Sequence, residues 1–488
     1  MRHSICVRSL LILFAMLVSA MSLVTPARAE DTRTYVKIAK NENEAPLDER
    51  YFDDPQEAWD FAASQSSGNA YLYLGSDWLV VKQNTLESDA HPCVFMDLKG
   101  HTVKRELGGS QVRNGGLFLV EKDAQLTIRD SNPQSEGYKG IRGGVITGGA
   151  NTNGGGAFTV ENGGRLEIQG GTIYKCTTNE HGGAVLIEGE NASFAMTGGR
   201  IYFCQTVGAW GKCHGGAVYC NKADVSFSDC TIDSCYSEDY GGALYMAKGR
   251  AVFKRVYMVG NHCQDYGGAI YMDQGGLKMY DSRVHGCEAK DDGGAIYDNS
   301  SNGMRLCDCI FYKNKSRGNG GALYINGKNA QFINIDVVAN SAEGNGGGVY
   351  VDSRYDIALK GLLHIENNSG KDGRNNLTLQ DGNATSALIM NGGLYEGSHI
   401  GLSSTSSGVM YSQSISETQM RYFFDDLGSL WLRDTTSRKA APFISSVFDE
   451  GAAGGVALGL GMAAIAGIVV YVLLTKRDQR KKAKEGQQ

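Results

Sequence analysis

Short apolar stretches recur along the middle of the chain in step with a repeated Gly-Gly pair. The pairs begin at Gly155, Gly182, Gly215, Gly241, Gly267, Gly293, Gly320 and Gly346. Successive pairs are 27, 33, 26, 26, 26, 27 and 26 residues apart. So regular an internal repeat indicates a solenoid, in which each repeat is one structural unit stacked on the next.

Three positions relative to each Gly-Gly pair are almost always apolar. Fourteen residues before it lie Ile168, Phe227, Phe253, Met279, Leu306 and Phe332; nine before it lie Ile173, Ile232, Met258, Val284, Phe311 and Val337; three after it lie Val185, Val218, Leu244, Ile270, Ile296, Leu323 and Val349. The stretches around them are too short and too glycine-bounded for helices, and they favour β-branched and aromatic residues. We therefore expect an all-β fold, a right-handed parallel β-helix with three strands per coil and coils stacked about 4.8 Å apart.

A polar or small residue occupies the position six before the Gly-Gly pair. It is Cys176, Cys235, Asn261, Cys287, Asn314 and Asn340 in successive repeats, and Cys204 belongs to the set although an insertion lengthens its repeat. Asparagine tolerates left-handed turn geometry, and its amide can bond to copies above and below. We expect a stacked ladder at one corner of the coil, in which cysteine substitutes as a small buried side chain.

Both ends of the chain carry membrane-targeting patterns. Residues 1–29 have a positive start, a short apolar core and the small-x-small site Ala27-Arg28-Ala29, as in a secretory signal peptide. Residues 451–475 form an uncharged segment that is long enough for a transmembrane helix. The basic tail 476–488 follows it. These patterns predict a single-pass protein of the cell membrane, with its body extracellular and its C-terminus cytoplasmic.

The segments between these ends divide into a cap, a solenoid and a stalk. Asp54-Pro55-Gln56-Glu57 is typical of a helix start, and with the strand-like residues 71–81 it predicts an N-terminal cap over residues 30–92. Residues 352–434 lose the Gly-Gly-Ala pattern but keep alternating apolar runs. We therefore expect the parallel β-helix over residues 93–434 and a stalk over residues 435–450.

Two motifs of the repeat resemble a known family. Phe311-Tyr-Lys-Asn314 followed by Gly320-Gly-Ala-Leu323 is similar to the paired Phe-x-x-Asn and Gly-Gly-Ala-Ile motifs of chlamydial polymorphic outer membrane proteins. The segments Asp97-Leu-Lys-Gly-His-Thr102 and Gly397-Ser-His-Ile-Gly-Leu402 look still more like the ends of β-helix surface proteins from Gram-positive gut bacteria. The resemblance implies a surface β-helix. The chlamydial proteins end in an outer-membrane barrel, whereas a single helix is expected here.

A row of tyrosines follows the Gly-Gly pairs. If the residues three and five positions after each pair face the core, the residue four positions after it faces outward; in six repeats it is Tyr219, Tyr245, Tyr271, Tyr297, Tyr324 and Tyr350. Such a stripe could bind sugar rings or an extended polypeptide. It could equally be a stack that only stabilises the sheet.

Some residues before the Gly-Gly pairs are weaker candidates for a metal site. Asp239, Asp265 and Asp291 lie two residues before their pairs, where one oxygen per coil is too few for calcium and a solvated turn is expected. His181 and His214 lie near Cys213 and Cys220, a set that could bind zinc or simply fill turns. We expect no metal or other cofactor.

The cysteines leave the disulfide pattern open. Eleven of the 12 cysteines lie beyond the signal peptide, so an odd number remains. Cys204 and Cys213, which flank the insertion, are the best candidates for a bridge, and buried free thiols are the alternative.

Charge and motifs narrow the function. A net charge of −6 gives no basic patch for nucleic acid. No catalytic set is evident, so we expect a non-catalytic, adhesin-like protein that binds a glycan or an extracellular protein; a polysaccharide lyase or hydrolase is the alternative. Gly455, Gly459, Ala463 and Gly467 recur every fourth residue of the expected anchor, a spacing that also permits self-association in the membrane.

Overall fold

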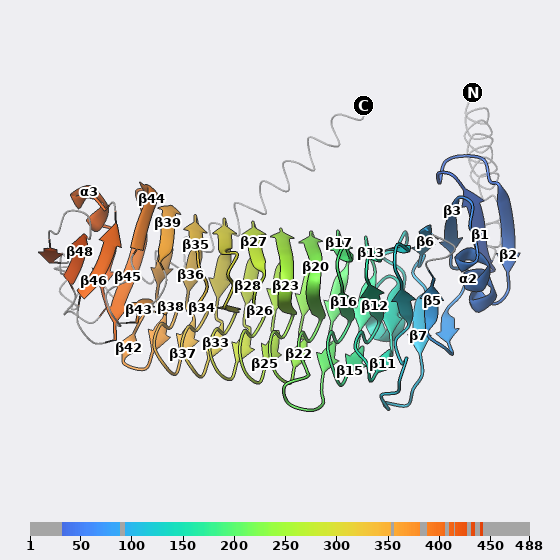
Figure 1. Cartoon of the computed structure of the whole chain (residues 1–488), viewed down its shortest axis with the longest axis horizontal. Helices are drawn as coiled ribbons and strands as arrows, with labels where there is room; N and C mark the ends of the chain where they lie inside the picture. Colours follow the sequence, from blue (N-terminus) through green and yellow to red (C-terminus); the bar gives the residue numbers. More distant parts are fainter. Residues whose placement is uncertain are drawn as a thin grey trace, which may run out of the picture. The chain divides into compact units, whose positions relative to one another are not determined.

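The computed structural model describes residues 32–87, 93–352, 356–380, 388–405, 409–413, 415–426, 431–434 and 440–442. The chain divides into two units, residues 1–443 and residues 444–488. The described part of the first unit is a stack of β-coils, as Figure 1 shows. The expected signal peptide, transmembrane helix and basic tail lie outside the described residues.

The strand that follows each Gly-Gly pair belongs to the first sheet of the stack. Parallel pairing joins the members of this sheet from coil to coil. Its strands are β5 (Asn84–Leu86), β8 (Phe118–Val120), β12 (Phe158–Glu161), β16 (Val185–Glu188), the start of β20 (Val218–Ser228), the start of β23 (Leu244–Lys254), β26 (Ile270–Met272), β30 (Ile296–Asp298), β34 (Leu323–Ile325), β38 (Val349–Val351), β43 (Leu377–Leu379) and the end of β45 (His399–Ser404).

The second sheet follows the first along each coil. In β20 and β23 one long strand runs through both sheets. Its other members are β3 (Asn69–Tyr73), β6 (Cys93–Asp97), β9 (Gln125–Arg129), β13 (Arg165–Ile168), β17 (Ser193–Met196), β27 (Gly276–Tyr280), β31 (Met304–Cys307), β35 (Ala330–Ile333), β39 (Ile357–Gly361), β44 (Leu388–Leu394), β46 (Val409–Gln413) and β48 (Trp431–Asp434).

The third sheet completes the three strands per coil that the apolar pattern predicts. It contains β4 (Trp78–Val80), β7 (Thr102–Arg105), β10 (Val145–Thr147), β14 (Thr172–Tyr174), β18 (Arg200–Tyr202), β21 (Thr231–Asp233), β24 (Tyr257–Val259), β28 (Arg283–His285), β32 (Ile310–Tyr312), β36 (Asp336–Val338), β40 (His364–Glu366), the start of β45 and β47 (Phe423–Asp425).

A fourth, much shorter sheet was not expected. It has two residues per coil and precedes the Gly-Gly turn, along the lower edge of the stack in Figure 1. Its strands are β11 (Ala150–Asn151), β15 (Thr177–Thr178), β19 (Gln205–Thr206), β22 (Tyr236–Ser237), β25 (His262–Cys263), β29 (Glu288–Ala289), β33 (Lys315–Ser316), β37 (Ser341–Ala342), β41 (Ser369–Gly370) and β42 (Gly373–Arg374). Two residues are too few for an apolar alternation, so sequence periodicity did not reveal it.

The predicted core positions are confirmed. Every residue named above at the positions fourteen before, nine before and three after a Gly-Gly pair is at most 1 % exposed. The residue five positions after each Gly-Gly pair also faces the core, and in one coil it is not apolar. Asp298 pairs in register with Met272 and Ile325, yet it is a fully buried carboxylate.

The asparagine ladder is confirmed and extends further than expected. The side chain of Asn340 accepts hydrogen bonds from the backbone and the amide of Asn314, and its own amide donates to Asn368. Asn368 donates to Asn376, whose backbone and side-chain N–H groups both donate to Asp426. The residue with left-handed backbone geometry at this corner is the one before each ladder residue, namely Lys313, Ala339 and Asn367 in three coils. The asparagines are therefore needed for the hydrogen bonds of their amides and not for the turn geometry.

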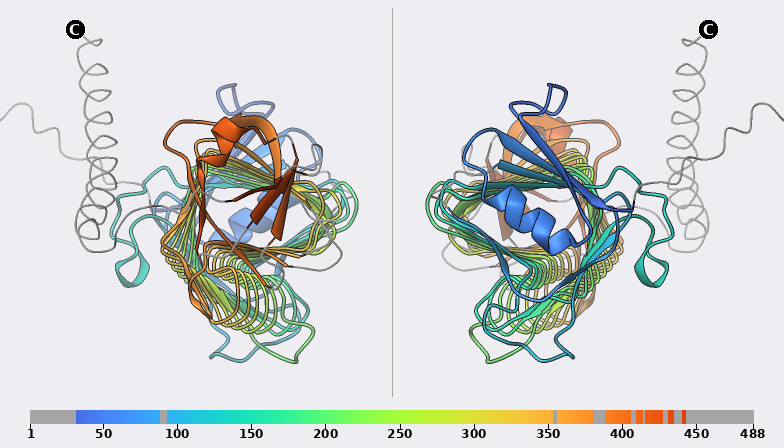
Figure 2. Two further views of the ribbon diagram at one scale, coloured as in Figure 1. Left: turned by 90° about the vertical axis from the view of Figure 1, so that its left-hand side faces the viewer. Right: turned by 90° about the vertical axis from the view of Figure 1, so that its right-hand side faces the viewer.

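The helix expected in the N-terminal cap forms, whereas the strand-like residues 71–81 expected to cover the first coil are strands of that coil. Helix α2 (Pro55–Ala63) begins at the N-cap Asp54, whose carboxylate accepts from the backbone N–H of Gln56. Trp59 of this helix packs on Phe118 at 5.0 Å between ring centroids, so α2 covers the open end of the core (Figure 2). Strand β1 (Thr34–Ala39) pairs antiparallel with β2 (Asp48–Phe52) and with β3. Parallel pairing starts at β3, so residues 69–86 form a first coil ahead of the expected start at residue 93.

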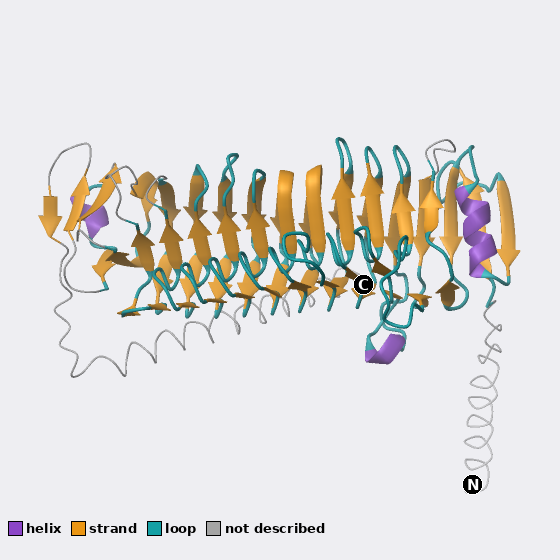
Figure 3. Ribbon diagram, turned by 60° about the horizontal axis from the view of Figure 1, so that its bottom comes forward, coloured by secondary structure: helices purple, strands orange, loops and turns teal. Residues whose placement is uncertain are grey.

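The remaining elements close the other end or project from the coils. Helix α3 (Glu417–Met420) and strand β49 (Ala440–Pro442), antiparallel to β48, lie at the C-terminal end. The 3₁₀ turn η2 (Tyr138–Gly140) belongs to a loop that projects from the stack in Figure 3. Among the residues that the structure describes, no helix is long and apolar enough to cross a membrane.

Candidate functional site

The Gly-Gly turn brings residues on either side of it onto one surface. At Gly267 the backbone has φ +71°, and a Cβ there would lie 2.3 Å from the carbonyl oxygen of Ile270. At Gly268 a Cβ would lie 2.1 Å from the carbonyl oxygen of Gly294 in the next coil. The first glycine therefore permits the sharp turn and the second permits close coil stacking. As a result, the residue before the pair folds back beside the residue four positions after it.

The six tyrosines of the first sheet form one continuous stack. Successive rings from Tyr219 to Tyr350 have centroids 5.3, 5.1, 5.1, 4.7 and 5.2 Å apart, and interplanar angles of at most 25°. Tyr219 is 8 % and Tyr350 is 5 % exposed, and the four rings between them are half-buried. Because each ring face contacts its neighbours, the stack presents ring edges and hydroxyl groups to solvent.

A second aromatic row lies against the first. The residue before the Gly-Gly pair is aromatic in four successive coils, namely His181, His214, Tyr240 and Tyr266. Each ring packs on the tyrosine of the next coil, at centroid distances of 4.2, 4.6, 5.0 and 4.8 Å. Sequence reasoning missed this row, although its constant position before the pair was a usable signal.

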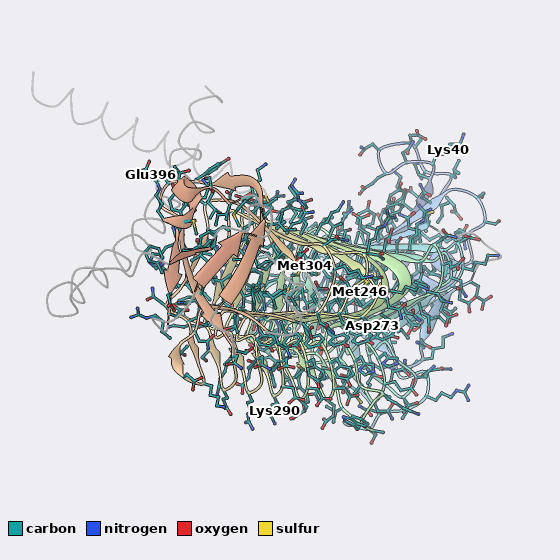
Figure 4. The ribbon with its side chains drawn as sticks, turned by 60° about the vertical axis from the view of Figure 1, so that its left-hand side comes forward. Lys40, Met246, Asp273, Lys290, Met304 and Glu396 are labelled. Atoms are coloured by element: carbon teal, nitrogen blue, oxygen red, sulfur yellow. The ribbon has the colours of Figure 1, made fainter. Side chains whose placement is uncertain are left out.

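Carboxylates and amides line the opposite side of the tyrosine stack. Six residues after the Gly-Gly pair, the amide of Asn326 donates to Asn299, and the amide of Asn299 lies 3.5 Å from Asp273. Figure 4 labels Asp273 of this row and Lys290, which lies three residues before a Gly-Gly pair. The pKa of Tyr219 is raised to about 12, mainly by burial and, to a smaller extent, by the negative charge of Glu188. The pKa of Tyr350 is also raised to about 12, mainly by burial and, to a smaller extent, by the negative charges of Asp352 and Asp292. The phenols therefore remain neutral hydrogen-bond donors at physiological pH.

The tyrosine stack continues into a small cavity at its N-terminal end. In the earlier coils the position of the tyrosine is taken by Leu119, Thr159 and Leu186. These shorter side chains line a cavity of about 200 Å³ together with Glu161 and Glu188. The outer surface of the first sheet is thus an aromatic stack followed by an acidic hollow.

The aspartates before the turn are only partly in the expected solvated environment. Asp291 is exposed and Asp265 is half-buried. Asp239 is fully buried, and its carboxylate accepts from the backbone N–H of Cys213 at 2.7 Å. The insertion over residues 207–212 leads into Cys213, which contacts Asp239, so the prediction of a solvated turn is wrong for this residue.

The histidine and cysteine candidates do not converge on a zinc site. The rings of His181 and His214 stack at 5.0 Å as part of the aromatic row. Cys220 faces the core, with Sγ 3.3 Å from the carbonyl oxygen of Ala223. Cys213 points toward the carbonyl oxygens of Asn179 and Ala209. Within the described ranges, no three His, Cys, Asp or Glu side chains are placed to hold a metal ion.

The proposed bridge between Cys204 and Cys213 is absent. All eleven cysteines of the described residues are free thiols. Cys204 points into the core, where burial and the neighbouring Cys176 raise its pKa, whereas Cys213 closes the insertion. Nine of these eleven thiols are buried, as in the alternative, and Cys93 and Cys307 are half-buried.

The insertion places an exposed tryptophan beside the aromatic rows. Residues 207–212 are exposed, and Trp210 is 77 % exposed. Its indole Nε1–H lies 3.3 Å from Oδ2 of Asp265, two coils further along. The unequal repeat length of 33 marked this coil in the sequence, but the direction of the loop could not be predicted.

Comparison with known proteins supports the fold. Residues 212–370, about a third of the chain, match the family described as the right-handed β-helix region. No curated protein and no solved structure shows a significant match. The parallel sheets and this match together make the chain a right-handed β-helix repeat protein.

Proposed function

We propose that this protein is an adhesin-like cell-surface protein that binds an extracellular ligand along the first sheet without catalysis. The observation that carries the proposal is the tyrosine stack from Tyr219 to Tyr350 with its second aromatic row. A rigid surface of ring edges and phenol groups offers apolar contact and hydrogen bonds with little loss of side-chain entropy on binding.

The ends of the chain support a surface location. An N-terminal segment typical of a signal peptide precedes the coils, and an uncharged segment over residues 451–475 with a basic tail follows them. The resemblance of the repeats to surface β-helices of chlamydiae and Gram-positive gut bacteria agrees with this location. Coils at about 4.8 Å spacing make a support of roughly 55 Å for the binding surface. Gly455, Gly459, Ala463 and Gly467 would allow such molecules to associate in the membrane.

The alternative is a polysaccharide lyase or hydrolase on the same scaffold. Hydrolysis needs two carboxylates converging across a groove, and elimination from an acidic sugar needs a base and a cation to neutralise the substrate. Carboxylates along the tyrosine stack would repel an acidic polysaccharide. This charge disfavours a lyase that acts on acidic polysaccharides, and Asp239, Asp265 and Asp291 are the first residues to test for the enzymatic alternative.

The test is to probe glycan and extracellular-protein arrays with the full chain in detergent micelles, and to incubate it with the polysaccharides present on the arrays. We expect retention of at least one ligand and no shortening of any polysaccharide. Depolymerisation by the wild-type protein, abolished when Asp265 and Asp291 are changed to Asn, would establish the enzyme instead. Retention of no ligand would contradict the binding function.

A further inference from the structure

Acidic residues border the tyrosine stack on both sides. In the two positions before the Gly-Gly pairs and the sixth position after them, from the repeat of Gly155 to that of Gly346, nine residues are acidic and none is lysine or arginine. A bulge places one lysine, Lys248, in register with Asn221 of the row after the turn, so the acidic residues outnumber the basic ones there. These acidic residues are Glu180, Asp239, Asp265, Asp291 and Asp292 before the turn, and Glu161, Glu188, Asp273 and Asp352 after it.

The field of these carboxylates reaches the aromatic rings. Burial is the main cause of the raised pKa of Tyr271, and Asp273 adds to it. Asp292 and Asp352 act in the same way on Tyr324. Burial and the neighbouring Asp239 and Asp291 also raise the pKa of Asp265. The surface therefore carries a concentrated negative potential that a cationic ligand would relieve.

Trp210 supplies a specific position for such a ligand. Its indole stands exposed beside the half-buried carboxylate of Asp265. Beneath the insertion, Asp239 is fully buried, and its Oδ1 has no hydrogen-bond partner among the described residues. A guanidinium or ammonium group next to an indole and a carboxylate gains both a cation–π contact and a charge-assisted hydrogen bond.

The geometry of the tyrosine stack disfavours a glycan as the occupant. Sugar rings pack on the faces of aromatic rings, but here neighbouring tyrosines at 4.7 to 5.3 Å already cover those faces. A polypeptide extended along the stack would meet the phenol hydroxyl groups instead, and its alternate side chains on one face would recur about every 7 Å. That spacing lets several basic side chains reach the bordering carboxylates.

We propose that the ligand of the tyrosine surface is an extended polypeptide rich in arginine or lysine, with one cationic side chain over the ring face of Trp210 and beside the carboxylate of Asp265. The inference rests on the proposed binding function and narrows its ligand to one class. The bordering carboxylates would repel an anionic polypeptide. A neutral glycan lacks the cationic groups that these carboxylates attract.

The probes are three short fluorescein-labelled peptides in which serine alternates with arginine, glutamine or glutamate, together with the neutral sugar cellohexaose as an unlabelled ligand. Binding to the full chain in detergent micelles is measured by fluorescence anisotropy, and by calorimetry for the sugar. We expect the arginine peptide to bind at least about tenfold more tightly than the other two peptides.

Two variants test where the arginine peptide binds. Trp210→Ser, and the double change Asp265→Asn with Asp291→Asn, should each weaken binding about tenfold. The control is the double change Asp224→Asn with Asp229→Asn, which removes the same charge from exposed aspartates at the second sheet. The control should alter binding by less than about twofold.

Each other outcome overturns the inference in a recognisable way. Equal loss in the control and the test variants means that the peptide responds only to net charge. Binding of cellohexaose without binding of the arginine peptide overturns the cationic ligand but leaves the binding function intact. No binding of any probe, together with an array that retains nothing, rejects both.

Discussion

The ring of Tyr245 lies parallel to the ring of Tyr271, with centroids 5.1 Å apart and an angle of 2° between their planes. The same relationship extends through six coils, so these side chains act as one rigid surface. It stabilises the first sheet through aromatic contacts between coils, each worth about 1 kcal/mol beyond burial. It also determines what a ligand can touch, because only edges and hydroxyl groups remain accessible.

Changing Ile270 to Asp should severely destabilise the stack. Ile270 is fully buried between Leu244 and Ile296 of the neighbouring coils, so the variant would place an unpaired charge in the core. We expect a loss of roughly 4 kcal/mol, measured by denaturant unfolding. The control is Val252→Asp in the same coil, at a side chain that is 38 % exposed, where the loss should stay below about 1 kcal/mol. Equal stability of the two variants would contradict the inward assignment of Ile270.

The asparagine ladder should be sensitive to a single truncation. Asn340→Ala removes the acceptor for the backbone N–H of Asn314 and the donor to the carbonyl oxygen of Phe311, both in buried surroundings. We expect a loss of about 3 kcal/mol in thermal or denaturant unfolding. Asn340→Cys should cost less, because the thiol that other coils use at this position fills the space. A variant Asn340→Ala as stable as the wild type would show that the amide bonds add nothing.

The periodic part of this fold was predictable because each coil repeats the same physical requirement. Leu244, Ile270 and Ile296 occupy one core position in successive coils, so the pattern in sequence equals the ladder in space. The fourth sheet was not predictable, since its two-residue strands carry no alternation. Asp298 was likewise hidden, because a polar residue at an inward position is indistinguishable from an outward one until its burial is known.

The candidate site was predictable in part. The position of the tyrosine row followed from alternation along the strand, but whether the rings stack or stand apart depends on side-chain conformation. The contact of Tyr240 with Tyr271 depends on the path of the Gly-Gly turn. The placement of Trp210 depends on the direction of an insertion that occurs in one repeat only.

Asp298 should make stability fall as the pH rises. Burial raises its pKa to about 6, above the ordinary value of 3.8, so the folded chain holds a proton that the unfolded chain has already released. The contribution of Asp298 to stability is therefore greatest below about pH 4, decreases through the window from about 4 to 6, and stays lower above it. Asn keeps the shape of the side chain without the charge.

The measurement is unfolding of Asp298→Asn at pH 4 and pH 7.5. The variant should gain about 2 to 3 kcal/mol over the wild type at pH 7.5 and little at pH 4. Glu343→Gln, at an exposed position, should change stability at neither pH. An equal gain for Asp298→Asn at both pH values would show that charge burial is not its cause.

The proposed topology predicts that the coils are accessible from outside the cell. Strand β49 shows that part of the expected stalk over residues 435–450 belongs to the C-terminal end of the coils. Protease added to intact cells should still release a soluble fragment that contains nearly the whole β-helix, by cutting between β49 and the expected membrane anchor. Immunoblots for the coils and for the C-terminal tail would follow the two parts separately. Coils that stay protected while the cells remain sealed would reverse the assigned orientation.

The binding surface is tested most directly by removing the middle of the tyrosine stack. Tyr245, Tyr271 and Tyr297 are changed together to Ser, and retention of an array-identified ligand is compared with the wild type. The matched control changes Tyr174, Tyr202 and Tyr312, half-buried tyrosines of the third sheet, to Ser. Circular dichroism confirms that both variants fold. We expect the first variant to lose the ligand and the control to keep it; a folded first variant that still binds the ligand as tightly as the wild type would contradict the tyrosine surface as the binding site.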